Sequence, residues 1–211
     1  MRTNIAREPS LTKGEKTRRR ILECVTELYY KNGLSGMSLG KVTETLGLSQ
    51  PAIYTHFRNM DEIILQACRH WVTEAKTIID RRSDMLATSR SQIDAVIEQN
   101  IRYSANNLDK EAMLLLLFYQ SLTSVEAHSL YSAIMENGMA RLQIIIQRGI
   151  QDGSWKVKDS KATAADIHSL LLGEIMKLIL SKSKRGAGPA IERMKIAVHS
   201  LLGLHHMDRS E

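Results

Sequence analysis

Residues 38–57, SLGKVTETLGLSQPAIYTHF, contain two short helical patterns with a single glycine between them. Ser38 is a suitable N-cap for a helix over residues 39–46, because its hydroxyl can accept a hydrogen bond from a free N–H of the first turn. Gly47 is suited to end that helix, since glycine adopts the left-handed conformation without strain. Ser49 is the N-cap of a second helix that continues to the end of the segment. Two short helices joined by such a tight turn predict a helix-turn-helix.

The two faces of this segment differ in character. Its apolar residues occupy the positions where two steeply crossing helices need contacts, and these are Leu39, Val42, Leu46, Leu48, Ile53 and Phe57. The outer positions of the second helix carry Gln50, Pro51, Tyr54 and Thr55, with His56 near its end. No Asp or Glu lies between Gln50 and Met60, so this face has no acid that would repel a phosphate group.

The excess positive charge of the chain is concentrated in its first quarter. The formal net charge is +6, and residues 1–60 hold ten Lys or Arg against five Asp or Glu, whereas residues 61–211 hold nineteen against eighteen. A basic segment beside a nearly neutral one suits a protein that binds a polyanion at one end. A solvated basic N-terminus is the alternative interpretation of the same charges.

Helical periodicity continues through the rest of the chain. The three prolines lie outside the long periodic stretches, and no run of β-branched residues alternates with polar ones. We therefore expect an all-α chain that begins with a polar arm over residues 1–11. The other helices are predicted at about 13–32, 60–82, 90–107, 110–124, 126–151, 161–182 and 188–205.

Several kinds of function find no support in the sequence. Cys24 and Cys68 lie in apolar helical stretches without a second ligand at metal-binding spacing, which favours buried free thiols in a reducing cytoplasm. The first ten residues are polar and unlike a signal peptide, and no apolar run reaches the length of about 18 residues that spans a membrane. No nucleophile–base pair and no phosphate-binding glycine loop is visible. We expect no catalytic residue, no metal and no cofactor, and a cytoplasmic location.

The helix-turn-helix and its flanks match one recurrent pattern from about residue 17 to residue 67. The matching positions are Thr17-Arg18, Ile21-Leu22, Asn32-Gly33, Ser38-Leu39, Val42, Leu46-Gly47-Leu48-Ser49, Ile53-Tyr54-Thr55-His56-Phe57 and the segment 59–63. In these residues the chain resembles the TetR family of bacterial transcriptional regulators. The resemblance implies an arm and a three-helix DNA-binding domain over residues 1–59. A long helix then joins it to a helical effector-binding and dimerisation domain over residues 60–211.

The resemblance also implies which residues contact double-stranded DNA. Phosphates and sugars position such a motif, and base edges in the major groove give it specificity. The residues that match backbone-facing positions are Ser38, Lys41 and Thr43; those that match base-facing positions are Gln50, Pro51, Ala52 and Thr55; those that match phosphate contacts are Tyr54 and His56. Arg18, Ser49 and Asn59 complete the expected set. His56 is also suited to cap its helix without touching DNA.

Two positions depart from the family pattern. Met60 stands where a lysine is common, which removes one expected phosphate contact. Gly40 stands inside a helix where a longer side chain is usual, at a cost of about 1 kcal/mol relative to alanine. The basic run over residues 16–20 is expected to compensate, because each neutralised phosphate adds salt-dependent affinity. A solvated first turn is the alternative for that run.

Residues 110–120, KEAMLLLLFYQ, are apolar on all sides, so this helix is expected to be buried. In the resembled family such a region lines a pocket for a small hydrophobic effector. The candidate ligand-binding residues are Tyr103, Met113, Leu117, Phe118, Tyr119, Gln120, His168 and Glu174. Ordinary core packing is the alternative for them. Trp155 is expected to pack over a helix junction.

The last two predicted helices have wide apolar faces. In the resembled family the corresponding pair forms a four-helix dimer interface, and the small Gly173 would permit close approach. The candidate interface residues are Ile167, Leu171, Ile175, Leu178, Met194, Val198 and Leu201. The alternative is packing within one chain.

We therefore expect a cytoplasmic homodimeric regulator that a small molecule releases from a near-palindromic operator, and by family precedent a repressor. The alternative is a DNA-binding regulator without a small-molecule effector, controlled by a protein partner. An enzyme or a membrane protein is disfavoured.

Overall fold

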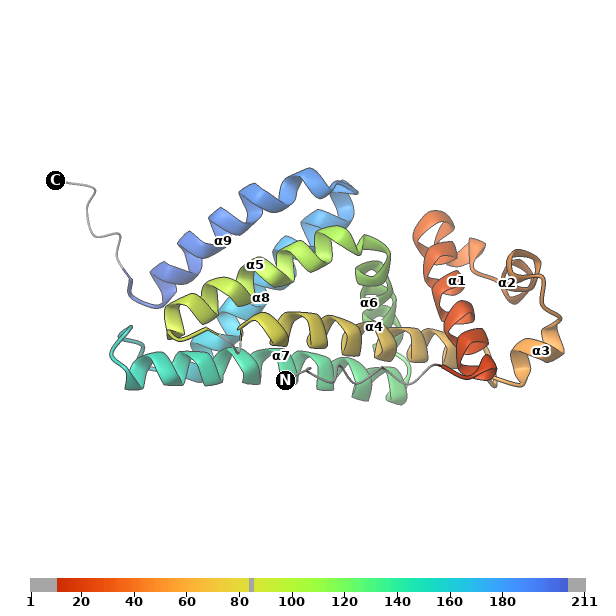
Figure 1. The fold of residues 1–211 in the computed structure, drawn as a ribbon, viewed down its shortest axis with the longest axis horizontal. Coiled ribbons are helices and arrows are strands. Elements are labelled where there is room, and N and C mark those ends of the chain that lie inside the picture. The colour runs from red at the N-terminus through yellow and green to blue at the C-terminus, as the bar shows by residue number, and fades with distance from the viewer. Residues whose placement is uncertain (1–10, 84–85, 205–211) are drawn as a thin grey trace, which may run out of the picture. The chain divides into compact units, whose positions relative to one another are not determined.

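The computed structural model describes residues 11–83 and 86–204, and every regular element in those ranges is a helix (Figure 1). This confirms the prediction of an all-α chain. The predicted arm over residues 1–11 lies almost entirely outside the described residues. The fold divides into two compact units, Met1–Ala67 and Cys68–Glu211. The division falls inside one helix, so the first residues of the long helix group with the helix-turn-helix.

The first unit begins with helix α1, Lys13–Gly36, whose start is fixed by a capping box. The Thr12 hydroxyl accepts a hydrogen bond from the Glu15 N–H at 3.3 Å, and the Glu15 carboxylate accepts one from the Thr12 N–H at 2.7 Å. Gly33 has a φ of 67°, which interrupts the helical backbone near the predicted end. A last irregular turn continues the helix to Gly36.

The two helices of the motif are short. Helix α2 covers Leu39–Leu46, as predicted, and helix α3 covers Gln50–Tyr54. Helix α3 ends earlier than expected, but the Phe57 N–H still donates to the Ile53 carbonyl at 3.1 Å, so the turn continues beyond it. Helix α4, Met60–Ser83, follows at once. The core of this unit contains fully buried side chains from α1, α2 and α3, among them Ile21, Val25, Val42 and Ile53.

The second unit packs five further helices with the rest of α4. These are α5 (Ser89–Asn106), α6 (Leu108–Ser121), α7 (Val125–Gln151), α8 (Ser160–Ser181) and α9 (Ala187–Leu201), with a short 3₁₀ turn η1 (Lys184–Gly186) before the last. Helix α7 packs against α6 and α8, and α5 packs against α8 and α9 (Figure 1). Helix α9 ends at Leu201, short of the predicted residue 205.

Trp155 closes the junction between α7 and α8. Its side chain is buried against Gly149, and its indole N–H donates to the Ile146 carbonyl at 2.8 Å. This agrees with the expectation that Trp155 packs over a helix junction. The hydrogen bond satisfies the one polar atom of the indole, so the ring can be buried at little cost.

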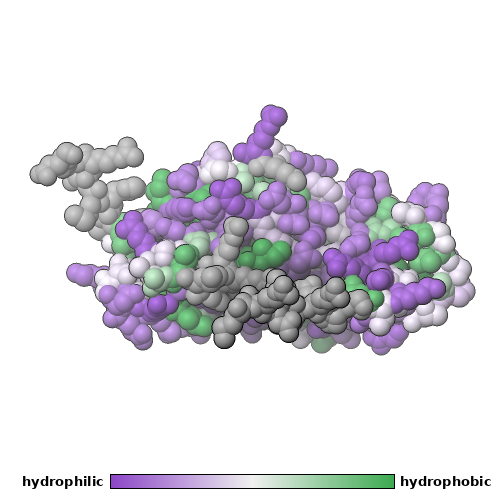
Figure 2. Space-filling view, in the orientation of Figure 1, coloured by the Kyte–Doolittle hydropathy of each residue, from purple (hydrophilic) through white to green (hydrophobic). Residues whose placement is uncertain are grey.

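On the face of the molecule that Figure 2 presents, hydrophobic side chains form small separate groups among hydrophilic ones. Among the residues with assigned positions, no helix combines the length and the apolar character that crossing a bilayer requires. Cys24 and Cys68 are both free and buried, as predicted, and burial raises the pKa of each thiol.

Candidate functional site

Side-chain caps fix the two helices of the motif. The Ser38 hydroxyl accepts from the Lys41 N–H, and the Ser49 hydroxyl accepts from the Ala52 N–H, each at 3.3 Å. Gly47 between the helices has a φ of 63° and ends α2 in the left-handed conformation. Two serine caps and one left-handed glycine therefore fix the ends of α2 and the start of α3 by local geometry.

The outer face of α3 is polar and exposed. Gln50, Pro51, Tyr54 and Thr55 are all exposed, with about half of Tyr54 (51%) accessible. The side chains of Gln50 and Tyr54 form no hydrogen bond within residues 11–83 and 86–204, so their polar atoms remain available to a ligand. The Thr55 hydroxyl donates to the Ala52 carbonyl at 2.7 Å and keeps its acceptor capacity. Ala52 is half-buried.

Helix α2 presents two further polar residues. Lys41 is exposed and forms an ion pair with Glu44 at 3.0 Å, a surface pair that water and salt weaken. Thr43 is half-buried, and its hydroxyl donates to the Gly40 carbonyl at 2.8 Å. Gly40 is the second residue of α2, in its first turn and not in the helix interior, and a Cβ there would lie 3.9 Å from the Ser38 hydroxyl oxygen, an ordinary contact.

Arg18 and Asn59 hold the chain on either side of Phe57. The Arg18 guanidinium donates to the His56 carbonyl at 2.7 Å and lies 4.3 Å from the centre of the Phe57 ring. The Asn59 side chain accepts from the Glu62 N–H at 2.9 Å and caps α4. Both residues therefore have a structural role, and His56 itself is half-buried.

Sequence reasoning overlooked Arg58, which lies between α3 and α4. Its side chain is 87% exposed, and its backbone N–H donates to the Glu62 carboxylate at 2.7 Å. That backbone hydrogen bond lowers the pKa of Glu62, with a smaller contribution from the Arg58 charge. The sequence did contain a signal, because Arg58 directly follows Phe57, the last core residue of the motif.

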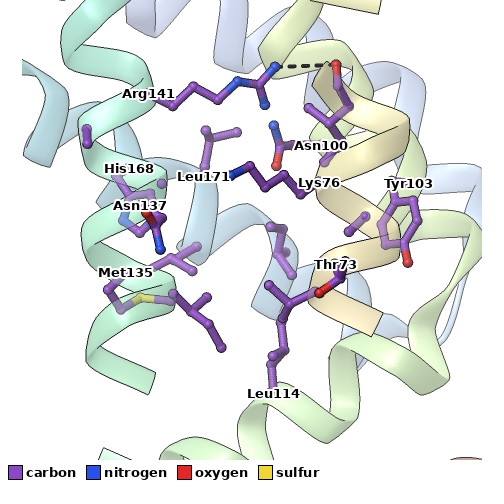
Figure 3. A pocket seen from close by; sticks show the side chains of 18 of the residues that line it. Thr73, Lys76, Asn100, Tyr103, Leu114, Met135, Asn137, Arg141, His168 and Leu171 are labelled. Carbon is purple, nitrogen blue, oxygen red and sulfur yellow. Dashed lines mark hydrogen bonds between the residues drawn. The ribbon is translucent and has the colours of Figure 1, made fainter. Parts of the chain in front are cut away.

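The second unit contains a cavity of about 980 Å³ between α4, α5, α6, α7 and α8 (Figure 3). Of the predicted ligand-binding residues, Tyr103 and His168 line it. Met113 and Leu117 are fully buried in the core beside it, while Phe118 and Tyr119 lie on the surface. An all-apolar helix does not reveal which of its sides faces a hollow.

Gln120 and Glu174 also lie outside the cavity lining. Glu174 joins α8 to α9 through an ion pair with Arg193 at 3.1 Å, and it pairs with Lys177 at 3.0 Å. Burial alone would raise the pKa of Glu174, but the hydrogen bonds and charges of these two cations outweigh it and lower the pKa. The ion pairs with Lys177 and Arg193 therefore account for a glutamate at this buried position of α8.

The cavity holds polar residues that sequence reasoning missed. From α4 come Arg69, Thr73 and Lys76, at helical spacing on one face, and from α7 come Asn137 and Arg141. In Figure 3, Lys76 and Arg141 extend from opposite helices into the space between them. Because long polar side chains on a helix are ordinarily solvated, their spacing alone did not mark them as cavity residues.

Glu111 is a buried carboxyl beside the cavity. The Ser104 hydroxyl donates to it at 2.8 Å, and burial raises its pKa to about 7. Burial lowers the pKa of His168 for the same reason, since it too disfavours the charged form. Within the described ranges, no group of His, Cys, Asp and Glu side chains could hold a metal ion.

Most of the predicted dimer residues lie in the core of the single chain. Ile167, Leu171, Leu178, Met194 and Val198 are buried, Ile175 lines the cavity, and Leu201 is 40% exposed. The regular spacing of apolar residues in α8 and α9 therefore reflects mainly the faces that pack within the chain. The exposed apolar residues of these helices are Leu170, Met176, Leu180, Ile196 and Leu201.

Comparison with known proteins bears on both units. Residues 21–67 match the family model described as "Bacterial regulatory proteins, tetR family". No curated protein sequence matches the chain. The family match covers the helix-turn-helix and the start of α4, the same part of the chain in which the family residues were recognised.

Solved structures with the same fold cover nearly the whole chain. A regulator from Saccharomonospora viridis, solved in complex with choline, is 21% identical, with a TM-score of 0.76 over 89% of this chain and 96% of that one. A tetR-family protein from Rhodococcus RHA1 is 15% identical, with a TM-score of 0.75 over 91% and 98%. GusR from Salmonella enterica is 18% identical, with a TM-score of 0.73 over 92% and 100%. At these identities the likeness concerns the fold.

Proposed function

Because residues 21–67 make this chain a member of the TetR family of bacterial regulators, we propose that it binds a near-palindromic operator and leaves it when a small molecule binds. The family consists of transcription factors, so the chain is a transcriptional regulator and not an enzyme. By family precedent the regulation is repression, and it acts in the cytoplasm.

The observation that carries the DNA-binding proposal is the exposed outer face of α3. Gln50 and Tyr54 point polar groups to solvent from a helix whose direction is fixed by the Ser49 cap. The side-chain amide of Gln50 can donate a hydrogen bond to N7 of adenine and accept one from its N6 amino group in the major groove. Tyr54 and Arg58 are suited to phosphates, which bind hydroxyl and guanidinium groups without regard to sequence.

A homodimer would use the outer faces of α8 and α9. Leu170, Gly173, Met176 and Leu180 recur every three or four residues along α8, and Leu180 is 81% exposed. A row of exposed apolar side chains along one helix gains free energy when another protein surface covers it. No atom lies near the Gly173 side, which leaves room for a second helix. A two-fold dimer would present its two α3 helices about 34–36 Å apart, one turn of DNA.

The effector site is the cavity of the second unit. Its size is within the range of small-molecule sites, and one structure of the same fold is a complex with choline. A core without any hollow would have favoured the alternative, control by a protein partner. Residues of α4 line the cavity, and the same helix begins at Met60 beside the motif. A ligand that binds better to one position of α4 shifts the population toward it and thereby changes operator affinity.

Selection of bound duplexes from a random DNA pool tests this proposal. We expect a consensus with two-fold symmetry, bound much more tightly than random duplex. Enrichment without any consensus would contradict the operator proposal. A consensus without two-fold symmetry would contradict the dimer and leave sequence-specific binding intact.

A further inference from the structure

The side chains that line the cavity are unequal in charge. Its described lining contains the cations Arg69, Lys76, Lys110, Arg141 and Arg148, but only one carboxyl, that of Glu111. The Glu111 carboxyl already accepts a hydrogen bond from Ser104. Lys110 is paired with Glu74, which lies outside the lining, so the excess positive charge of the lining comes from the three arginines and Lys76.

Within the described part of the chain, two of these cations, Arg69 and Lys76, have side chains that form no ion pair or hydrogen bond, and both residues are exposed. Lys76 extends from α4 into the cavity (Figure 3). Arg141 extends toward the same space from α7 while donating to the Ile79 carbonyl at 3.3 Å. Two cations from opposite walls thus define one end of the cavity.

Much of the remaining lining is apolar. Leu114 and Met135 lie on the side away from Arg141, Leu171 lies near Lys76 and Arg141 (Figure 3), and Ile175 of α8 adds further apolar surface. Thr73 and Asn137 are polar lining residues on the side of Leu114 and Met135 (Figure 3). A ligand that fills the cavity must therefore satisfy both cations and apolar surface. Charged groups bind tightly in a partly enclosed site only when an opposite charge meets them.

We infer that the effector is an amphipathic organic anion, such as a carboxylate with an alkyl or aryl body. Its anionic group lies between Lys76 and Arg141, and its apolar body lies between α6, α7 and α8. This inference rests on the proposed function, because it assigns the chemical class of the molecule that the effector cavity takes.

The arrangement of Lys110 disfavours a quaternary ammonium ligand. A cage for such a cation needs open aromatic faces. Here the Lys110 ammonium itself lies 4.4 Å from the centre of the Trp71 ring and 6.0 Å from that of Tyr103. It is held there by an ion pair with Glu74 at 2.6 Å. The aromatic groups of this cavity thus already face a cation of the protein.

Calorimetric titration with three alkyl compounds of equal chain length tests the charge preference. The probes are decanoate, decanol and decyltrimethylammonium, each titrated into the full-length chain without DNA. We expect decanoate to bind at least about tenfold more tightly than decanol, a difference of about 1.4 kcal/mol. We expect decyltrimethylammonium to bind more weakly than either. Equal binding of all three, or tightest binding of the ammonium compound, would overturn the inference.

Substitution of Lys76 tests the residue. Lys76→Met removes the charge and keeps an unbranched side chain one heavy atom shorter, and we expect it to remove most of the preference for decanoate over decanol. Lys76→Arg is expected to retain the preference, and Lys161→Met, an exposed lysine outside the cavity lining, to leave it unchanged. The ratio of the two affinities cancels any general loss of folded protein. An unchanged ratio in Lys76→Met would overturn the assignment.

The two proposals fail in different ways. Binding without charge preference would contradict the anion and leave the effector cavity standing. Failure of every probe to bind would overturn both the anion and the effector role of the cavity. The DNA selection is independent of either result.

Discussion

The two units of this molecule build their candidate sites in opposite ways. In the first unit, helices of eight and five residues are held by local caps and turn their polar side chains out to solvent. In the second, helices of 14 to 27 residues enclose a cavity whose lining comes from residues far apart in the chain. A site on a capped turn is fixed by its own sequence, whereas a cavity depends on how several long helices pack. Substitutions in the two units are therefore expected to have different consequences.

The largest expected effect is that of Gly149→Ala in the second unit. A Cβ at this position would overlap the indole of Trp155, which would have to leave its buried place and lose its hydrogen bond to Ile146. We expect a loss of about 3 kcal/mol in the free energy of unfolding. Both tryptophans of the chain, Trp71 and Trp155, lie in this unit, so denaturation followed by tryptophan fluorescence measures it.

Gly188→Ala is the control for that substitution. No atom lies within reach of a Cβ at Gly188 in α9, so the added methyl group meets open space. The prediction fails if the two substitutions change stability equally, because close packing on Trp155 would then not matter.

Glu111→Gln is expected to change how the stability of the second unit depends on pH. Burial raises the pKa of Glu111 from about 4.5 to about 7, so the folded state favours the protonated form. The stability that this group contributes is fully present below pH 4.5 and is lost as the pH rises through 7. Glu111→Gln is expected to leave stability little changed at low pH and to raise it by up to about 3 kcal/mol above pH 7.

Urea denaturation of both proteins below pH 4.5 and above pH 7 measures this effect. Glu192→Gln, an exposed glutamate on α9, is the matched control. A stability change of the same size in acid and in alkaline buffer would show that the charge of Glu111 is not what destabilises the fold.

In the first unit, Gln50→Ala is expected to change sequence preference with little effect on stability, since Gln50 is exposed. Loss of a base contact costs about 1–3 kcal/mol at the base pair concerned. Repeating the pool selection with this variant measures the change. Equal loss of affinity for every duplex would contradict a base-reading role.

Tyr54→Ala is expected to weaken binding to all duplexes by about tenfold, because a phosphate contact carries no sequence information. The selected consensus is expected to stay the same. A changed consensus would assign Tyr54 to the bases instead, and unchanged affinity would remove it from the interface.

The smallest expected effect is that of Gly40→Ala, which is the counterpart of Gly149→Ala in the first unit. A Cβ at Gly40 would make an ordinary contact of 3.9 Å with the Ser38 hydroxyl oxygen, and alanine has the higher helix propensity, so we expect stabilisation of up to about 1 kcal/mol. Hydrogen exchange of the α2 amides measures it locally. Destabilisation would mean that the backbone at Gly40 needs the freedom of glycine.

The helix-turn-helix was predictable because its information is local. Ser38, Gly47 and Ser49 each satisfy or end a neighbouring turn, so their spacing alone fixed the ends of α2 and the start of α3. Arg18 was harder to interpret, since its partners His56 and Phe57 lie about forty residues away in the chain. A long-range contact of this kind leaves no periodic trace in the sequence.

The cavity could be predicted only in part. The apolar segment 110–120 was expected to form a buried helix, but Phe118 and Tyr119 are 44% and 64% exposed. Its inner residues Met113 and Leu117 pack in the core, while the hollow lies beside Leu114. Lys76 was missed because an exposed lysine on a helix is the usual case, and nothing local in the sequence marks one that also lines a cavity. Periodicity tells which side of a helix is covered, and only the packing of the neighbouring helices decides whether a space remains there.

Titration of the full-length chain against the selected duplex and a scrambled duplex of equal length tests the central claim most directly. The measurement is made at about 50 and about 200 mM salt, because phosphate contacts make affinity fall with salt. We predict binding to the selected duplex at least about a thousandfold tighter than to the scrambled one, with both affinities reduced at the higher salt. Equal affinity for the two duplexes, or no binding at the lower salt, would contradict a sequence-specific regulator that reads DNA through α3.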